Sequence, residues 1–249
     1  MPLLIRFLAL AFLLSGGTGQ VLLAQQAGIE WLTTRNGLSQ GYISSMLQDR
    51  EGFLWAGTKN GLNRYDGYRF EVFTKDPYDE FSLSNDFVTW VSEYGDFLLV
   101  GTDAGGLNIF YKKTRKFYRL HEPLPNSNNA FERSNITWNA VDAKGNIWTT
   151  SMGLNGMVHL YRFEIPAGFW KNPPNNNNWQ KQVVAQSWPF EIDGASSMDK
   201  EGKHIYIGRN EGVFKLDIES ATWTLILGKF SPEKRNLGSF IKTGYDGNI

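Results

Sequence analysis

The sequence predicts an all-β fold, a β-propeller built from four-stranded antiparallel blades. Three observations lead to this prediction. The chain repeats itself at blade-length intervals, its apolar residues alternate over short runs without a helical period, and it is rich in turn-forming and aromatic residues, with 26 Gly, 9 Trp, 10 Tyr and 17 Phe. Aromatic side chains pack well on pleated surfaces and glycine allows positive φ, so this composition is typical of short strands joined by tight turns.

The repeat is marked by Gly57, Gly101, Thr150 and Gly208, which are separated by 44, 49 and 58 residues. Such intervals are typical of propeller blades lengthened by inserts. Each copy contains four alternating segments between Gly- or Asn-centred turns, which predicts one antiparallel sheet per copy. The predicted blades are residues 38–75, 83–120, 134–186 and 190–227, with the start of a fifth blade at 236–249.

An Asp-x-x-Gly element occurs in three of the copies. Repeated carboxylates could converge around a ring for catalysis, but turn chemistry is the preferred interpretation, because Asp accepts nearby backbone N–H groups and Gly adopts the left-handed conformation. The aromatic residue that follows is predicted to fill the wedge between blades rather than to stack on a cofactor. The elements are Asp49/Gly52, Asp142/Gly145 and Asp199/Gly202, followed by Trp55, Trp148 and Tyr206.

Composition excludes several classes of function. The 25 basic and 25 acidic residues give no net charge, so nucleic acid is not an expected partner. The absence of cysteine excludes thiol catalysis, disulfides and iron–sulfur clusters. His121, His159 and His204 have no carboxylate at metal-ligand spacing and are interpreted as ordinary surface or strand residues. No catalytic residue, metal site or cofactor site is predicted.

The N-terminus is typical of a secretory signal peptide. Arg6 precedes the apolar run 7–14, and small residues follow at 15–19 and at Ala24. Glycines interrupt the apolar run before it reaches the roughly 20 residues that span a bilayer, which disfavours a retained membrane anchor. The prediction is a signal peptide over 1–24 and an exported, periplasmic chain over 25–249.

The first copy carries a specific resemblance. Its residues Gly37-Leu-Ser39, Asp49-x-x-Gly52-Phe-Leu-Trp55-Ala-Gly-Thr58 and Gly61-Leu-x-Arg-Tyr-Asp-Gly67 resemble the two-component regulator propeller repeat, and the likeness continues to the end of the chain. Two departures are Leu99 in place of the aromatic residue and Thr150 in place of glycine. The resemblance implies the periplasmic sensor region of a hybrid two-component histidine kinase that responds to polysaccharide breakdown products, with a parent protein anchored in the inner membrane.

The number of blades predicts an incomplete ring. Residues 28–32 resemble the end of a blade and are interpreted as an outermost strand whose partner strands would come from the far end of the propeller. Four blades and a fragment would leave a blade face open. The chain is therefore expected to be an N-terminal fragment whose partners are the remaining blades or domains of a longer sensor, or a second copy in a homodimer.

Two inserts, 121–133 and 166–189, are the longest departures from the repeat. Asn side chains near Trp170, Trp179 and Trp188 would suit an oligosaccharide ligand. The preferred interpretation is nevertheless a solvated, mobile linker between outer strands, and the ligand-binding residues stay unknown.

Three functions are compatible with these observations. The leading one is a signal-input module that binds a ligand, with a carbohydrate as the expected ligand, and catalyses no reaction. The alternatives are a propeller glycan hydrolase or lyase with two convergent carboxylates, and a protein-interaction scaffold. Acidic residues outside turns are sparse on the predicted inner strands, which disfavours the enzyme. Kinase motifs are absent from this segment, and fold alone cannot choose among the three.

Overall fold

The structure, a computed structural model, describes residues 30–120, 131, 134–153, 156, 158–166, 168–190, 196–209 and 212–228. The predicted signal peptide, the fifth blade, His121 and most of the first insert lie outside these residues. The described residues from Leu32 onward make up one compact unit. No helix within the described residues is both long and apolar enough to span a membrane.

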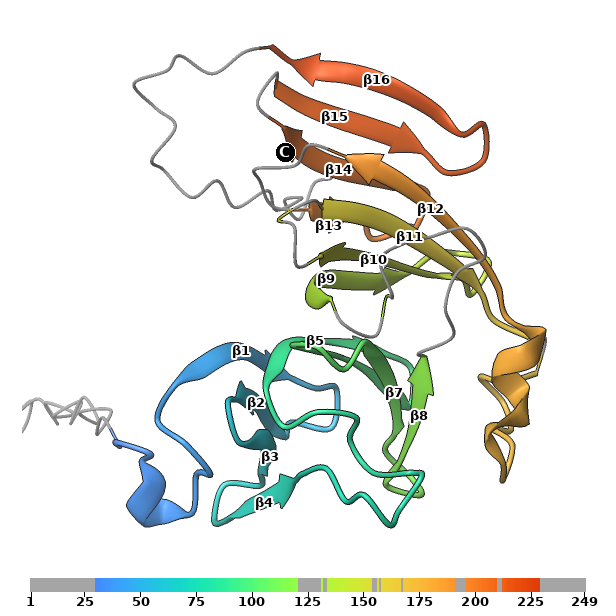
Figure 1. Cartoon of the computed structure of the whole chain (residues 1–249). Coiled ribbons are helices and arrows are strands. Elements are labelled where there is room, and N and C mark those ends of the chain that lie inside the picture. Colours follow the sequence, from blue (N-terminus) through green and yellow to red (C-terminus); the bar gives the residue numbers. More distant parts are fainter. Residues whose placement is uncertain are drawn as a thin grey trace, which may run out of the picture. The chain divides into compact units, whose positions relative to one another are not determined.

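The described residues form four antiparallel sheets of four strands each, and in every sheet the strands follow chain order (Figure 1). This confirms the predicted all-β fold with four-stranded blades. The first sheet contains β1 (Ile43–Gln48), β2 (Leu54–Thr58), β3 (Gly61–Tyr65) and β4 (Phe70–Phe73). The second contains β5 (Val88–Tyr94), β6 (Phe97–Thr102), β7 (Leu107–Tyr111) and β8 (Lys116–Leu120).

The third sheet contains β9 (Asn135–Val141), β10 (Ile147–Met152), β11 (Val158–Glu164) and β12 (Val184–Phe190). The fourth contains β13 (Ser196–Met198), β14 (His204–Arg209), β15 (Gly212–Asp217) and β16 (Thr222–Leu227). The elements with described bounds also include two 3-10 helices, η1 (Thr34–Asn36) and η3 (Asn177–Gln182).

The strand register agrees with the alignment of the copies. Gly57 pairs with Ser45 and Leu62, and Gly101 pairs with Trp90 and Leu107. Thr150 holds the same place in the third sheet, between Trp138 and Leu160. A sequence repeat is thus a structural repeat, including the copy that lacks the glycine.

Successive sheets contact each other through their first strands. β1 lies against β5, β5 against β9, and β9 against β13. Three buried clusters fill the spaces between neighbouring sheets. Trp55 and Phe110 belong to the cluster of the first and second sheets, and Trp148 and Ile205 to that of the third and fourth. Packing of this kind gives each blade one apolar face toward the next.

Two boundaries differ from the sequence-based expectation. β12 ends at Phe190, whereas the third blade was expected to end at residue 186, because its pairing with β11 continues to the Val158–Phe190 pair. Residues 30–32, which were interpreted as part of an outer strand, belong to no strand in the described part of the chain, and the Trp31 side chain is 80% exposed. An outer strand needs a neighbour to complete its hydrogen bonds.

Candidate functional site

The Asp-x-x-Gly elements are turns, as predicted. Asp49 Oδ1 accepts the backbone N–H groups of Glu51 and Phe53, both at 3.0 Å, and Gly52 has a φ of 91°. The second carboxylate oxygen has a role that the sequence analysis missed. Asp49 Oδ2 accepts a hydrogen bond of 2.8 Å from the indole Nε1 of Trp55. The carboxylate therefore joins the turn to the aromatic core.

The third sheet repeats this arrangement. Asp142 accepts the backbone N–H groups of Lys144 and Asn146 and the indole N–H of Trp148, each at 2.9 Å. The spacing of six residues between Asp and Trp in both copies was the sequence feature that could have predicted this hydrogen bond. A carboxylate whose two oxygens are occupied by four protein groups, the Asn146 side chain included, is not free to act as an acid or a base.

Trp55 and Trp148, which follow two of these turns, lie between sheets, as predicted. Trp55 is 1% exposed and contacts Phe110 of the second sheet edge to face, with ring centroids 5.6 Å apart. Trp148 is 2% exposed and stacks on Trp188 at 5.6 Å. Tyr206 is also buried. No face of the Trp55 or Trp148 ring is left for a cofactor.

The repeated glycine makes room for the next blade. A Cβ atom on Gly57 would lie 2.7 Å from the Val88 side chain, and one on Gly101 would lie 2.5 Å from that of Ile136. Both neighbours are on the first strand of the following sheet. Beside each glycine, a hydroxyl group donates to that same strand: Ser44 to the Val88 carbonyl, and Thr89 to the Ile136 carbonyl. These contacts join successive blades.

In each of the first two sheets, a polar cluster binds the segment that precedes the first strand to the third strand. Ser39 donates its backbone N–H to Asn63 Oδ1, the Asn63 amide donates to Ser39 Oγ, and Thr58 Oγ1 lies 2.9 Å from that hydroxyl. Ser84 and Asn108 repeat the same pair in the second sheet, beside Thr102. These contacts explain, without a ligand, why the Leu-Ser and Gly-Thr dipeptides recur in the repeat.

The second insert is held in the core by two aromatic side chains, which the interpretation as a solvated linker did not predict, although many of its other described residues are exposed. Phe169 is 3% exposed and Trp179 is 4% exposed. Both belong to the cluster between the second and third sheets, together with Leu99. Leu99 occupies the position where other copies carry an aromatic residue. The insert thus supplies aromatic side chains to the one described wedge whose own blade lacks this aromatic residue.

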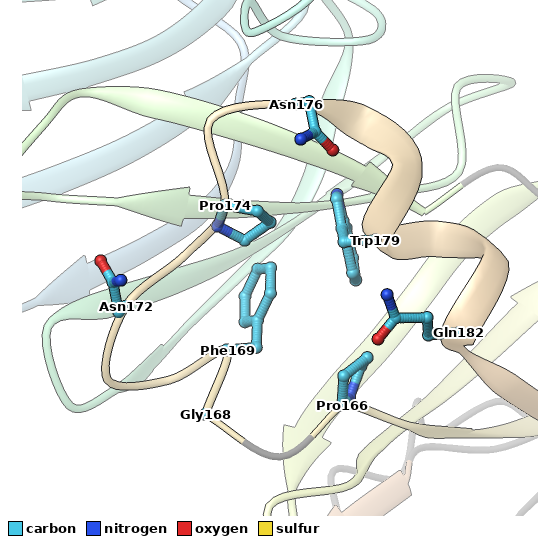
Figure 2. A pocket seen from close by; sticks show the side chains of 8 residues that line it. All are labelled: Pro166, Gly168, Phe169, Asn172, Pro174, Asn176, Trp179 and Gln182. Atoms are coloured by element: carbon cyan, nitrogen blue, oxygen red, sulfur yellow. The ribbon is translucent and has the colours of Figure 1, made fainter.

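The insert also contains a cavity of about 520 Å³, which we call the insert cavity. Phe169 and Trp179 line it, with ring centroids 4.5 Å apart, and amide side chains lie around it (Figure 2). None of the described lining residues carries a charge. They are Pro166, Gly168, Phe169, Asn172, Pro174, Asn176, Trp179 and Gln182.

Only one of the three tryptophans proposed from the sequence lines this cavity. Trp179 lies in its wall. Trp170 instead packs against Tyr94 of the second sheet and donates its indole N–H to the Gly145 carbonyl at 2.9 Å. Trp188 is on β12, stacked on Trp148. Trp170 and Trp188 are therefore half-buried contacts between elements, away from this cavity.

Comparison with known proteins identifies the repeat. Residues 37–60 match the two component regulator propeller family. The resemblance predicted from the first copy is thereby confirmed, and the match includes the Ser39, Asp49, Trp55 and Thr58 contacts described above. No curated protein sequence matches the chain significantly.

The solved structures similar to this chain include extracellular domains of sensors. The extracellular domain of the putative hybrid two component system BT4673 from B. thetaiotaomicron is 18% identical, with a TM-score of 0.57, and the match covers 88% of this chain and 30% of that one. That of BT3049 from the same organism is 18% identical, with a TM-score of 0.44 and coverage of 80% and 32%. The chain thus spans about a third of these domains.

Carboxylates converge at two places in the described part of the chain, and each group surrounds a side-chain cation or imidazole. At the first, Lys112 Nζ lies 2.9 Å from Glu93, 3.4 Å from Asp49 and 3.7 Å from Glu51. Burial would raise the pKa of Asp49, but the hydrogen bond from Trp55 and the charge of Lys112 outweigh it and hold the pKa below its ordinary value.

The pKa of Lys112 is affected in the opposite direction. Burial would lower it, but the hydrogen bond to Glu93 and the charges of Asp49 and Glu51 raise it above its ordinary value. The cluster connects the first sheet to the second, since Asp49 and Lys112 lie in turns of different sheets. It holds charged partners from the two sheets together.

The second group of carboxylates surrounds His204 on β14. Its Nδ1 lies 2.6 Å from Asp199 and its Nε2 lies 3.3 Å from Asp217, so both ring nitrogens face carboxylates of the same sheet. His159 lies half-buried on β11, where burial lowers its pKa. The described residues contain no group of histidines and carboxylates suited to a metal ion.

Proposed function

We propose that this chain is a signal-input region of a two component regulatory system, exported to the periplasm, where it binds a carbohydrate without catalysing a reaction on it. The observation that carries the proposal is the regulator propeller match at residues 37–60, whose contacts recur in the second and third sheets. The parent protein would be an inner-membrane sensor with a histidine kinase, and the remaining blades or a second copy would be its partners.

The absence of a charge among the described residues of the insert cavity supports a neutral ligand. Amide groups such as those of Asn172 and Gln182 both donate and accept hydrogen bonds, which suits hydroxyl groups. The enzyme alternative requires two carboxylates facing an open site. The Asp49 and His204 clusters instead place their carboxylates against protein cations or imidazole, which favours binding over hydrolysis.

The test is a thermal-shift screen of the purified chain with a library of neutral and acidic oligosaccharides. Binding at a hundredfold excess over Kd adds about 2.7 kcal/mol of stability, which raises Tm by roughly 5 to 10 °C for a protein of this size. The expected result is such a shift with at least one neutral oligosaccharide and no release of reducing ends. Absence of any shift would exclude the carbohydrate ligand, and release of reducing ends would favour the hydrolase.

A further inference from the structure

The insert cavity contains a buried hydrogen-bond donor that has no partner. The indole Nε1 of Trp179 is buried and makes no hydrogen bond with the described residues. The neighbouring side-chain amide of Gln180, also 4% exposed, has an unpartnered Nε2. Buried N–H groups are nearly always paired, since an unpaired one loses its bond to water and gains nothing in return.

This donor belongs to the wall of the cavity. Figure 2 shows the Trp179 ring standing beside Phe169, with its nitrogen at the end near Asn176. Trp170, also in the insert, does have a partner, because it donates its indole N–H to the Gly145 carbonyl. The described residues thus leave this donor, at the edge of the cavity, without an acceptor.

We propose that the insert cavity is a binding site for a small uncharged ligand, and that this ligand places a hydrogen-bond acceptor on the indole N–H of Trp179. The inference deepens the proposed function by giving it a site, and it rests on that function for its biological meaning. The volume of about 520 Å³ is within the range of small-molecule sites. Charged ligands are disfavoured because no described lining residue would neutralise them.

The ligand would touch residues that join two blades. Phe169 and Trp179 come from the connection between β11 and β12 of the third sheet, yet both rings contact Tyr118 of the second sheet. Their centroids lie 5.3 Å and 6.3 Å from that of Tyr118. An occupied cavity would therefore fix the contact between the second and third sheets, which gives a route from binding to the packing of blades.

The experiment follows the indole N–H resonances of the nine tryptophans in the full 249-residue chain by nitrogen-15 NMR. The probe is N,N-dimethylacetamide, an uncharged acceptor without a donor, and acetate is the charged comparison. The Trp179 signal, assigned from nuclear Overhauser contacts and from Trp179→Phe, is expected to shift saturably with dimethylacetamide and at least tenfold more weakly with acetate. The Trp170 signal should stay in place.

Two variants keep the test independent of whether Trp179→Phe folds. Gln182→Trp crowds the cavity from an exposed position and should weaken the dimethylacetamide response at least tenfold, whereas Trp188→Phe, outside the cavity, should leave it unchanged. A Trp179 signal that does not move, or that moves equally with acetate or in Gln182→Trp, overturns the proposal. If the signal responds as expected but no oligosaccharide binds, the cavity is a site and the carbohydrate function fails.

Discussion

The glycine that faces the next blade should not tolerate a methyl group. Gly101→Ala would place a Cβ atom 2.5 Å from Cγ2 and 2.7 Å from Cβ of Ile136, and both are closer than real Cβ contacts come. Overpacking of this kind costs about 1–3 kcal/mol. The reduced freedom of the unfolded chain returns about 0.4–1 kcal/mol. The expected net loss of stability is therefore about 1.3 kcal/mol, within a range of about 0–2.6 kcal/mol.

The assay is urea unfolding of the chain followed by tryptophan fluorescence. The matched control is Gly41→Ala, since a Cβ on Gly41 meets nothing within 4 Å and its φ is not positive. The control should be neutral or slightly stabilising. A double variant with Ile136→Ala should show a coupling energy that relieves part of the Gly101→Ala loss. Equal or greater stability of Gly101→Ala alone would refute the close packing of the second and third sheets.

Three further predictions concern polar contacts. Lys112→Met should lower stability at pH 7 by about 1–3 kcal/mol. It should also flatten the pH profile. The contribution of Asp49, whose folded pKa is lowered, is present above about pH 4 and is lost as the pH falls. The contribution of Lys112, whose folded pKa is raised, is present below about pH 10.4 and is lost as the pH rises. Identical urea midpoints of the wild type and Lys112→Met at every pH from 3 to 10 would contradict this prediction. Asp142→Ala leaves four donors unpaired and should cost about 2 kcal/mol or more, and wild-type stability by calorimetry would disprove the turn assignment. Thr89→Ala removes a hydrogen bond of 2.6 Å to the Ile136 carbonyl and should cost about 1 kcal/mol, whereas Thr89→Ser should keep most of it.

Much of the fold could be predicted because the repeat encodes its own turns. Asp49 and Gly52 set a local hairpin, and Trp55 follows at a fixed distance, so their roles depend on neighbours in sequence. The reason for Gly57 could not be read in the same way, since the side chain that excludes a Cβ there belongs to Val88 of the next blade. Contacts between copies are invisible when each copy is read by itself.

The insert shows a second limit of sequence reasoning. Its prolines and asparagines indicate a loop, which is correct for residues 171–176, but composition does not reveal that Phe169 and Trp179 enter the core. An indication was present in the preceding blade, where Leu99 stands at the position of the aromatic residue of other copies. A blade that lacks its wedge aromatic leaves volume to be filled, and the insert that follows in the next blade fills it.

The packing of successive blades through their first strands is the central structural claim, and an engineered disulfide tests it most directly. Ser92 Oγ on β5 lies within hydrogen-bond distance of Asn139 Oδ1 on β9. The natural chain contains no cysteine, so introduced thiols would have no competing partner. We expect Ser92→Cys with Asn139→Cys to form an intramolecular disulfide on mild oxidation, measured by thiol titration and mass spectrometry. The control, Ser92→Cys with Ala140→Cys, places the second thiol on the opposite face of β9 and should stay reduced. Failure of the first pair to close, or equal closure of the control, would contradict the blade arrangement.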